Sequence, residues 1–316
     1  MTTVTTSQPA TSSPLRRLIS RHPLLTFFVI AFVGTWLTAL PVLLARNGLG
    51  LLPLTLPAQV LPGLDLLTLG AFTGPTLAAV IVTAATAGKA GLRQLLRRIV
   101  QWRVGVGWYL LALLGYPLIY VGIDSIALGV SSFPTLLVQW SLLFTVYFPY
   151  LLVNLISTMG EEMGWVGYAL PTLQQKVAPW LSAASLGVLW SLWHLPSFFI
   201  TGGDAPSAFS PAYFALFIVL GVTGRITWSW IFNKTRGSVI IIALLHAASS
   251  GAGIALLPRL SPPAPPLGTF LFLGLTVVVF PVLILIFTRG RLSYKPERNA
   301  QLVEVPRPAQ TPLTQM

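Results

Sequence analysis

The chain has 316 residues, of which 54% are hydrophobic and only 8% are charged, and its mean hydropathy is +0.79. So few charges cannot cover the surface of a water-soluble globule, which excludes a soluble enzyme, a disordered protein and a nucleic-acid-binding module. The net charge is +12, and cysteine is absent, which excludes disulfides, thiolate zinc sites and a cysteine nucleophile. The composition predicts an all-α fold, a polytopic bundle of transmembrane helices.

Eight apolar runs approach the ~20 residues that a membrane-spanning helix needs. The first is longer than the apolar core of a signal peptide and no A-x-A cleavage site follows it, so we expect it to be retained. These runs predict an N-terminal tail (1–23), a transmembrane domain (24–288) and a C-terminal tail (289–316). In chain order the eight runs cover roughly residues 24–45, 64–87, 107–130, 136–158, 180–200, 211–231, 238–257 and 267–288.

The basic residues are distributed asymmetrically between these runs. If the N-terminus is cytoplasmic, only Arg46 and Arg259 of the 19 Lys and Arg lie on outside segments, and Arg225 lies within the sixth run. The positive-inside rule therefore predicts that both termini are cytoplasmic. The polar ends, residues 1–13 and 299–316, are expected to be disordered.

Ionisable residues inside apolar runs are costly, so each suggests a function. The chain has seven acidic residues and three histidines. Asp204 is expected in an outside loop rich in Gly and Pro, and His22 at the membrane interface. Asp124 lies within the third run, where a structural ion pair with Arg225 is the favoured interpretation and a proton or substrate relay the alternative. The remaining informative residues are Glu161, Glu162, His194 and His246.

Glu161 and Glu162 are adjacent at the end of an apolar run. Neighbours on a helix point about 100° apart, so one carboxylate can face a cavity while the other binds a different partner. Such a pair suits general acid–base chemistry. A solvated pair at a cytoplasmic helix end is the competing interpretation.

The two histidines each have a partner four residues away, on the same face of a helix. Trp190 precedes His194, and Ser250 follows His246. One histidine in a span is often a structural hydrogen-bonding group. Two histidines and an acidic pair on three separate runs instead indicate water activation and oxyanion stabilisation. They are also potential zinc ligands, although no H-E-x-x-H motif is present.

The order and surroundings of these motifs resemble the CPBP intramembrane protease family, also described as the type II CAAX prenyl endopeptidase and bacteriocin-processing family. That family shows Glu-Glu-x-x-x-Arg, then Phe-x-x-x-His, then His-x-x-x-Asn or Asp. The corresponding motifs here begin at Glu161, Trp190 and His246, and the resemblance covers about residues 140–255. Val166 stands in the place of the motif arginine, and Ser250 in the place of Asn or Asp.

The resemblance implies an intramembrane endopeptidase of the bacterial cytoplasmic membrane, acting on a membrane-associated peptide or protein. It implies that Glu161 activates water with help from His194, that Glu162 supports the site, and that His246 and Ser250 hold the oxyanion. A zinc ion on Glu162, His194 and His246 and a metal-free mechanism are both compatible with these residues.

Two other function classes remain open. Val166 and Ser250 favour a catalytically degenerate family member that acts as a membrane immunity or regulatory factor. A proton-coupled transporter would use Glu161, Glu162 and the histidines as a relay. The lack of an inverted repeat and the clustering of these groups toward the cytoplasmic half argue against a transporter. The expected partners are a lipid bilayer and a membrane-associated substrate, with no nucleic acid.

Overall fold

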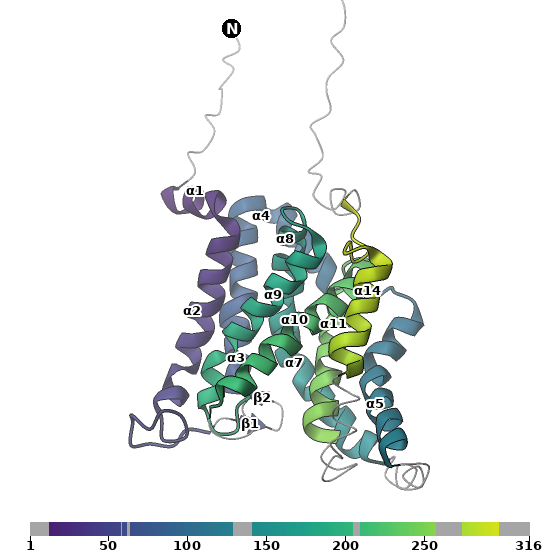
Figure 1. The fold of residues 1–316 in the computed structure, drawn as a ribbon. Helices are drawn as coiled ribbons and strands as arrows, with labels where there is room; N and C mark the ends of the chain where they lie inside the picture. Colours follow the sequence, from purple (N-terminus) through teal and green to yellow (C-terminus); the bar gives the residue numbers. More distant parts are fainter. Residues whose placement is uncertain are drawn as a thin grey trace, which may run out of the picture.

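The computed structural model describes residues 13–57, 59–61, 64–128, 141–204, 209–256 and 274–296. Within these residues the fold is a bundle of helices with one short antiparallel hairpin, formed by β1 (Gln59–Leu61) and β2 (Leu64–Asp65). The predicted all-α class is confirmed. The short helix α1 (Pro14–Arg21) and the last turn of α14 (Phe280–Thr288) lie at the same end of the bundle (Figure 1).

The helical segments follow one another along the chain with short connections. Several long helices contain a wide π-type turn, marked η, that continues the helix at a local distortion. The helical segments in the first half of the chain, after α1, are α2 (Pro23–Leu44), α3 (Leu66–Ala71), η1 (Phe72–Thr76), α4 (Leu77–Ile99) and α5 (Val106–Leu128). In the second half they are η2 (Leu143–Tyr147), α7 (Phe148–Gly164), η3 (Trp165–Ala169), α8 (Leu170–Gln174), α9 (Pro179–Trp193), the 3-10 turn η4 (Leu195–Phe199), α10 (Pro211–Lys234), α11 (Val239–Ser250), η5 (Gly251–Leu256) and η6 (Gly274–Val279).

These helices support the prediction of an integral membrane protein. Each predicted apolar run overlaps a helical segment of the described residues. In the part of the chain that the structure describes, four continuous helices are long and apolar enough to cross a membrane: Pro23–Leu44, Thr68–Ile99, Leu143–Gln174 and Pro211–Lys234. Three shorter apolar helices accompany them: Val106–Tyr120, Val239–Ile254 and Gly274–Thr288.

One predicted boundary is wrong in a way that matters for function. From Leu143 onward, the run expected to end at residue 158 belongs to a continuous helix that extends to Gln174. The wide turn η3 carries the chain past Gly164, and Pro171 falls in the first turn of α8, where its missing N–H is tolerated. Glu161 and Glu162 therefore lie inside a long helix and not at its end.

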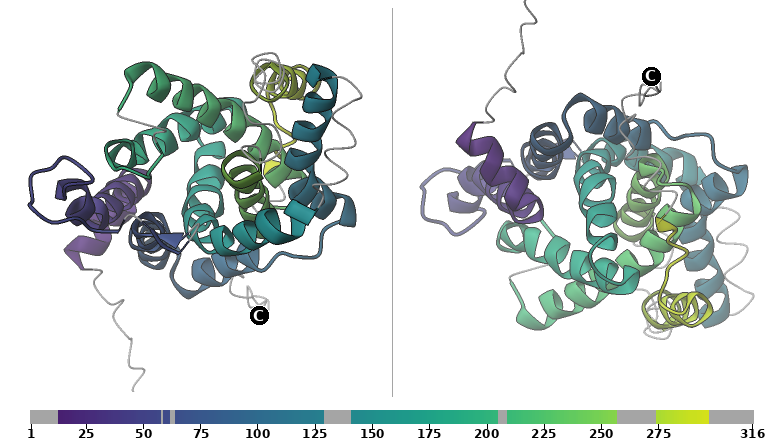
Figure 2. Two further views of the ribbon diagram at one scale, coloured as in Figure 1. Left: turned by 90° about the horizontal axis from the view of Figure 1, so that it is seen from below. Right: turned by 90° about the horizontal axis from the view of Figure 1, so that it is seen from above.

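Close helix contacts hold the interior of the bundle. A Cβ atom added to Gly164 of α7 would lie 2.5 Å from Pro75 of η1, and one added to Gly187 of α9 would lie 2.5 Å from Val222 of α10. Small residues at such crossings let helix backbones approach closely. Viewed along the bundle axis, α7 and α11 lie side by side among the other helices (Figure 2).

Some sequence-based predictions lie outside the described residues. They concern residues 1–12 and 297–316 of the two tails, the side chain of Asp124, and Arg259.

Candidate active site

The four residues singled out from separate apolar runs meet at one site. Glu161 and Glu162 come from α7, His246 from α11, and His194 follows the last residue of α9. Glu161 is 5% exposed, Glu162 is 0% exposed and His246 is 7% exposed. Burial of both carboxylates argues against the solvated-pair interpretation, because unpaired charges are not retained in a protein interior.

Glu161 and His194 face each other across a gap. Glu161 Oε2 accepts a hydrogen bond of 2.9 Å from the indole Nε1 of Trp190. The same oxygen lies 3.7 Å from His194 Nε2, too far for a direct hydrogen bond. His194 Nε2 is buried and has no hydrogen-bond partner in the described part of the chain. A separation of this kind is suited to a bridging water molecule.

The aromatic position of the second motif contributes a polar contact of its own. Trp190 stands where the family has Phe, and its N–H bonds Glu161, which a phenyl ring could not do. Its ring also packs against both imidazoles, with ring centres 4.4 Å from His194 and 5.7 Å from His246. Trp190 therefore holds one carboxylate oxygen and restricts both histidine rings.

Both oxygens of Glu162 are engaged. Oε1 contacts His246 Nδ1 at 2.9 Å, and Oε2 accepts a hydrogen bond of 2.6 Å from Nη1 of Arg225 on α10. The structure pairs Arg225 with Glu162, and the predicted ion pair between Arg225 and Asp124 stays a prediction because the side chain of Asp124 lies outside the described residues. Helix α10 places the guanidinium beside a carboxylate that is completely buried and would otherwise lack a counter-ion.

Asp204 is a site residue that sequence reasoning missed. Its Oδ2 lies 2.7 Å from His194 Nδ1 and also accepts a hydrogen bond from the hydroxyl of Ser197. Burial raises the pKa of Asp204, but His194 and Ser197 outweigh burial and hold the pKa below its ordinary value. An acid in a Gly- and Pro-rich loop is ordinary in sequence, so only its spacing from His194 could have suggested this contact.

The two departures from the family motifs have different surroundings. Val166 is completely buried in the apolar core, so the place of the motif arginine is filled by a packed side chain. Ser250 ends α11, one turn beyond His246, and is half-buried. No hydrogen bond joins Ser250 to the four site residues in the described structure, so its predicted role stays a prediction.

Comparison with known proteins now bears on this geometry. Residues 139–252 match the family described as type II CAAX prenyl endopeptidase Rce1-like. We call residues 139–252 the Rce1-like domain, after the family that they match. Its resemblance to the CPBP family is thereby confirmed. The CAAX prenyl protease 2 of Methanococcus maripaludis is 30% identical over 104 residues, which are 32% of this chain and 38% of that relative. The match thus spans well under half of the relative's length.

The Rce1-like domain contains every polar group of the site. Beyond Glu161, Glu162, His194 and His246 it includes Asp204 and Arg225. These two residues extend the site into two series of side-chain contacts. One series runs from Asp204 through His194 to Glu161. The other runs from Arg225 through Glu162 to His246.

The zinc site predicted on Glu162, His194 and His246 stays a prediction, and the structure groups a partly different set of donor atoms. Ligand atoms of Glu161, Glu162 and His246 lie within 4.8 Å of one another, and His194 is not part of this group. However, both oxygens of Glu162 are already bonded, one of them to a guanidinium. A divalent cation at Glu162 would lie beside the positive charge of Arg225, which opposes its binding.

Proposed function

We propose that this chain is an intramembrane endopeptidase that hydrolyses a peptide bond in a membrane-associated substrate, with Glu161 activating the attacking water. One observation carries the proposal. A buried carboxylate faces, across 3.7 Å, a buried imidazole nitrogen that has no hydrogen-bond partner among the described residues. A water molecule in that gap can donate one O–H to Glu161 and the other to His194, which leaves its lone pairs free for attack.

The two series of side-chain contacts assign a role to each proton in the reaction. Because an ionised carboxylate only accepts hydrogen bonds, Asp204 fixes the proton of His194 on Nδ1 and leaves Nε2 to accept from the water. As the water oxygen bonds to the scissile carbonyl carbon, its proton passes to Glu161. Glu161 then delivers that proton to the leaving nitrogen as the C–N bond breaks, which yields a carboxylic acid and an amine.

His246 is placed to stabilise the tetrahedral intermediate. Its Nδ1–H donates to Glu162, so Nε2 carries a proton only when the ring is an imidazolium. In that form Nε2–H can donate to the oxyanion. Ser250 is assigned to the same oxyanion through its hydroxyl group.

The domain's polar groups support a mechanism without a metal. Glu162 is neutralised by Arg225, and the water is held by Glu161 and His194 alone. We therefore expect that a strong chelator, followed by gel filtration, leaves the rate of peptide cleavage unchanged. Restored activity on adding zinc back to an inactive, chelated protein would contradict this expectation.

The experiment that tests the function is cleavage of membrane-associated peptides by the purified full chain, followed by mass spectrometry. The peptide set should include a prenylated CAAX peptide, because the relative is named for such a substrate. Cleavage by the wild-type protein but not by Glu161→Gln is the expected result. A wild-type protein that cleaves no peptide would favour a regulatory role, for which Val166 and Ser250 are the sequence signals.

The basic residues of α1 suggest how the protein is oriented in the membrane. The amphipathic helix α1 carries Arg16, Arg17 and Arg21, and it lies at the same end of the bundle as the last turn of α14 (Figure 1). The positive-inside rule places that end in the cytoplasm. We propose that both termini are cytoplasmic and that the membrane is the bacterial cytoplasmic membrane.

A further inference from the structure

We infer that Arg225 is a positioning residue that takes over the task of the motif arginine replaced by Val166. This inference rests on the proposed function. Arg225 is 1% exposed and its guanidinium is 2.6 Å from Glu162, which is 0% exposed. The pair is desolvated, so removing either member would leave the other without a counter-ion in the interior.

The aromatic side chains around Arg225 hold it in this position. Its guanidinium carbon lies 5.2 Å from the ring centre of Trp190 and 5.3 Å from that of Trp228. Both rings also contact His246. Such cation–π contacts are strongest away from water, and here they restrict the side chain to the vicinity of the site.

The cation that contacts Glu162 comes from a different helix than the family motif would place it on. An arginine at position 166 would lie one helical turn after Glu162 and would contact it within the same helix. In this chain the cation comes from α10 and joins α10 to α7, while Val166 packs in the apolar core. Arg225 therefore orients Glu162, and Glu162 in turn fixes the ring of His246.

The test compares Arg225→Met, which removes the charge at similar length, with Arg225→Lys, which keeps it. Because Arg225 acts through Glu162 and not on the substrate, Arg225→Met should lower kcat by about 100-fold with little change in KM. Arg225→Lys should recover at least about tenfold of that loss. The control is Arg98→Met, which removes a half-buried arginine that bonds the carbonyl of Gly167. It should leave kcat near the wild-type value.

Melting temperatures of all variants separate a folding defect from a defect in the site. The inference is overturned if Arg225→Met keeps a kcat close to that of the wild type, or if Arg225→Lys is as damaged as Arg225→Met. If Glu161→Gln also remains active, the proposed function itself fails. If Glu161→Gln is inactive while Arg225→Met is active, only the role of Arg225 fails.

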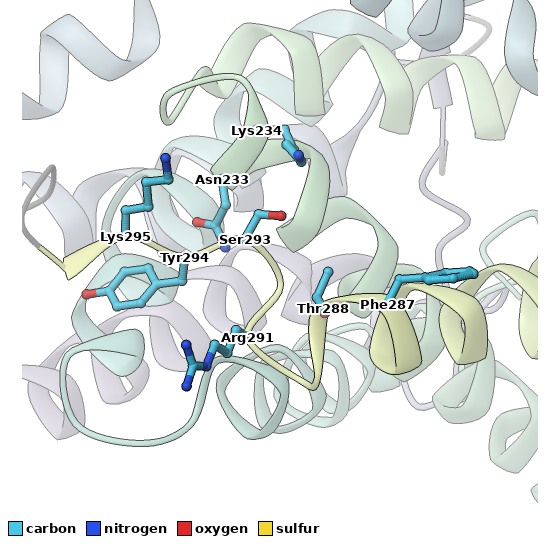
Figure 3. Close-up of a pocket in the computed structure, with 8 residues that line it drawn as sticks. All are labelled: Asn233, Lys234, Phe287, Thr288, Arg291, Ser293, Tyr294 and Lys295. Atoms are coloured by element: carbon cyan, nitrogen blue, oxygen red, sulfur yellow. The ribbon is translucent and has the colours of Figure 1, made fainter.

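A separate feature of the structure is a cavity of about 350 Å³ at the same end of the bundle as α1. It lies between the last turn of α10 and the segment that follows α14 (Figure 3). Three cationic side chains line it, Lys234, Arg291 and Lys295, together with the hydroxyl groups of Ser293 and Tyr294. No carboxylate of the described residues lines this cavity.

The wall of this cavity is a fixed structure. Leu292 and Ser293 have φ angles of 46° and 55°, in the left-handed region that side chains disfavour. Their conformation is held because Leu292 is completely buried against Ala183 and Ile226, and its carbonyl accepts a hydrogen bond of 3.0 Å from Asn233. Strained backbone that is held in this way often marks a binding site.

We propose that this cavity binds the phosphate headgroup of an anionic phospholipid. Cations and hydroxyl groups together match the charge and the acceptor oxygens of a phosphate. The neighbouring face of α14 is apolar and open, with Ile286 62% exposed and Phe287 81% exposed. A lipid satisfies both features, since its acyl chains can cover α14 while its phosphate enters the cavity.

The test is native mass spectrometry of the purified full chain, incubated with phosphatidylglycerol or with phosphatidylcholine. The variant is Lys234→Gln, Arg291→Gln and Lys295→Gln together. The control removes three exposed cations of α4 by Lys89→Gln, Arg93→Gln and Arg97→Gln. The cavity variant should retain at least about fivefold less phosphatidylglycerol, a difference of about 1 kcal/mol in binding free energy. The control should match the wild type.

Two results would overturn the lipid assignment. Equal loss of phosphatidylglycerol in both variants would show that diffuse surface charge binds the lipid. Displacement of phosphatidylglycerol by inorganic phosphate at comparable concentration would identify a free phosphate as the ligand.

Discussion

Replacing Glu161 by Gln should abolish peptide cleavage, because the amide cannot accept the proton of the attacking water. General acid–base groups typically contribute about 10²–10⁴-fold, and a loss of kcat in this range is expected. The change preserves shape and can preserve the hydrogen bond from Trp190, which an amide oxygen accepts as well. The measurement is the initial rate of cleavage of one membrane-associated peptide.

A control on the same helix is Thr158→Val. The hydroxyl of Thr158 is buried and donates to the carbonyl of Ala243 at 3.0 Å, without touching a titratable side chain of the site. This variant should melt at a lower temperature and keep its kcat. Cleavage by Glu161→Gln at the wild-type rate would rule out Glu161 as the base, whatever the outcome for Thr158.

Replacing Asp204 by Asn should lower kcat by about 100-fold or more. When the carboxylate partner of a catalytic histidine becomes an amide, the histidine can adopt the wrong tautomer while the geometry is kept. The pKa of Asp204 lies below its ordinary value because His194 and Ser197 outweigh burial. The carboxylate is therefore ionised throughout the neutral range, and the loss should be similar across that range.

The matched control for this prediction is Ser197→Ala. The hydroxyl of Ser197 bonds Asp204 and the backbone carbonyl of His194 but does not touch the His194 imidazole, so its loss should reduce kcat much less. KM should change little in either variant. If Asp204→Asn cleaved as fast as the wild type, Asp204 would be a structural partner of His194 without influence on the reaction.

Much of the fold could be predicted from hydropathy alone. A membrane-spanning helix satisfies its own backbone groups and needs an apolar surface of known length, and both requirements leave a signal in local sequence. The end of the run that carries Glu161 and Glu162 was missed, because two carboxylates and two glycines interrupt the apolar signal. The helix continues there since η1 and α11 cover those residues.

Some residues of the candidate site could be predicted from the sequence and others could not. Glu161, Glu162, His194 and His246 could be identified because ionisable residues are rare in apolar runs and their order resembles a known family. Asp204 could not be identified, because nothing in a polar loop marks the one carboxylate that folds back onto a histidine. The partner of Arg225 could not be identified either, since any buried acid on a neighbouring helix was a candidate.

The amino-acid sequence by itself determined the membrane class of this protein, its helical fold and the identity of four residues that meet at the candidate site. These properties depend on composition and on short spacings. Only the tertiary structure decided how Asp204 and Arg225 complete the two series of contacts and that both oxygens of Glu162 have hydrogen-bond partners. Those contacts join residues far apart in the chain, and their energies depend on distance and burial, which local sequence does not encode.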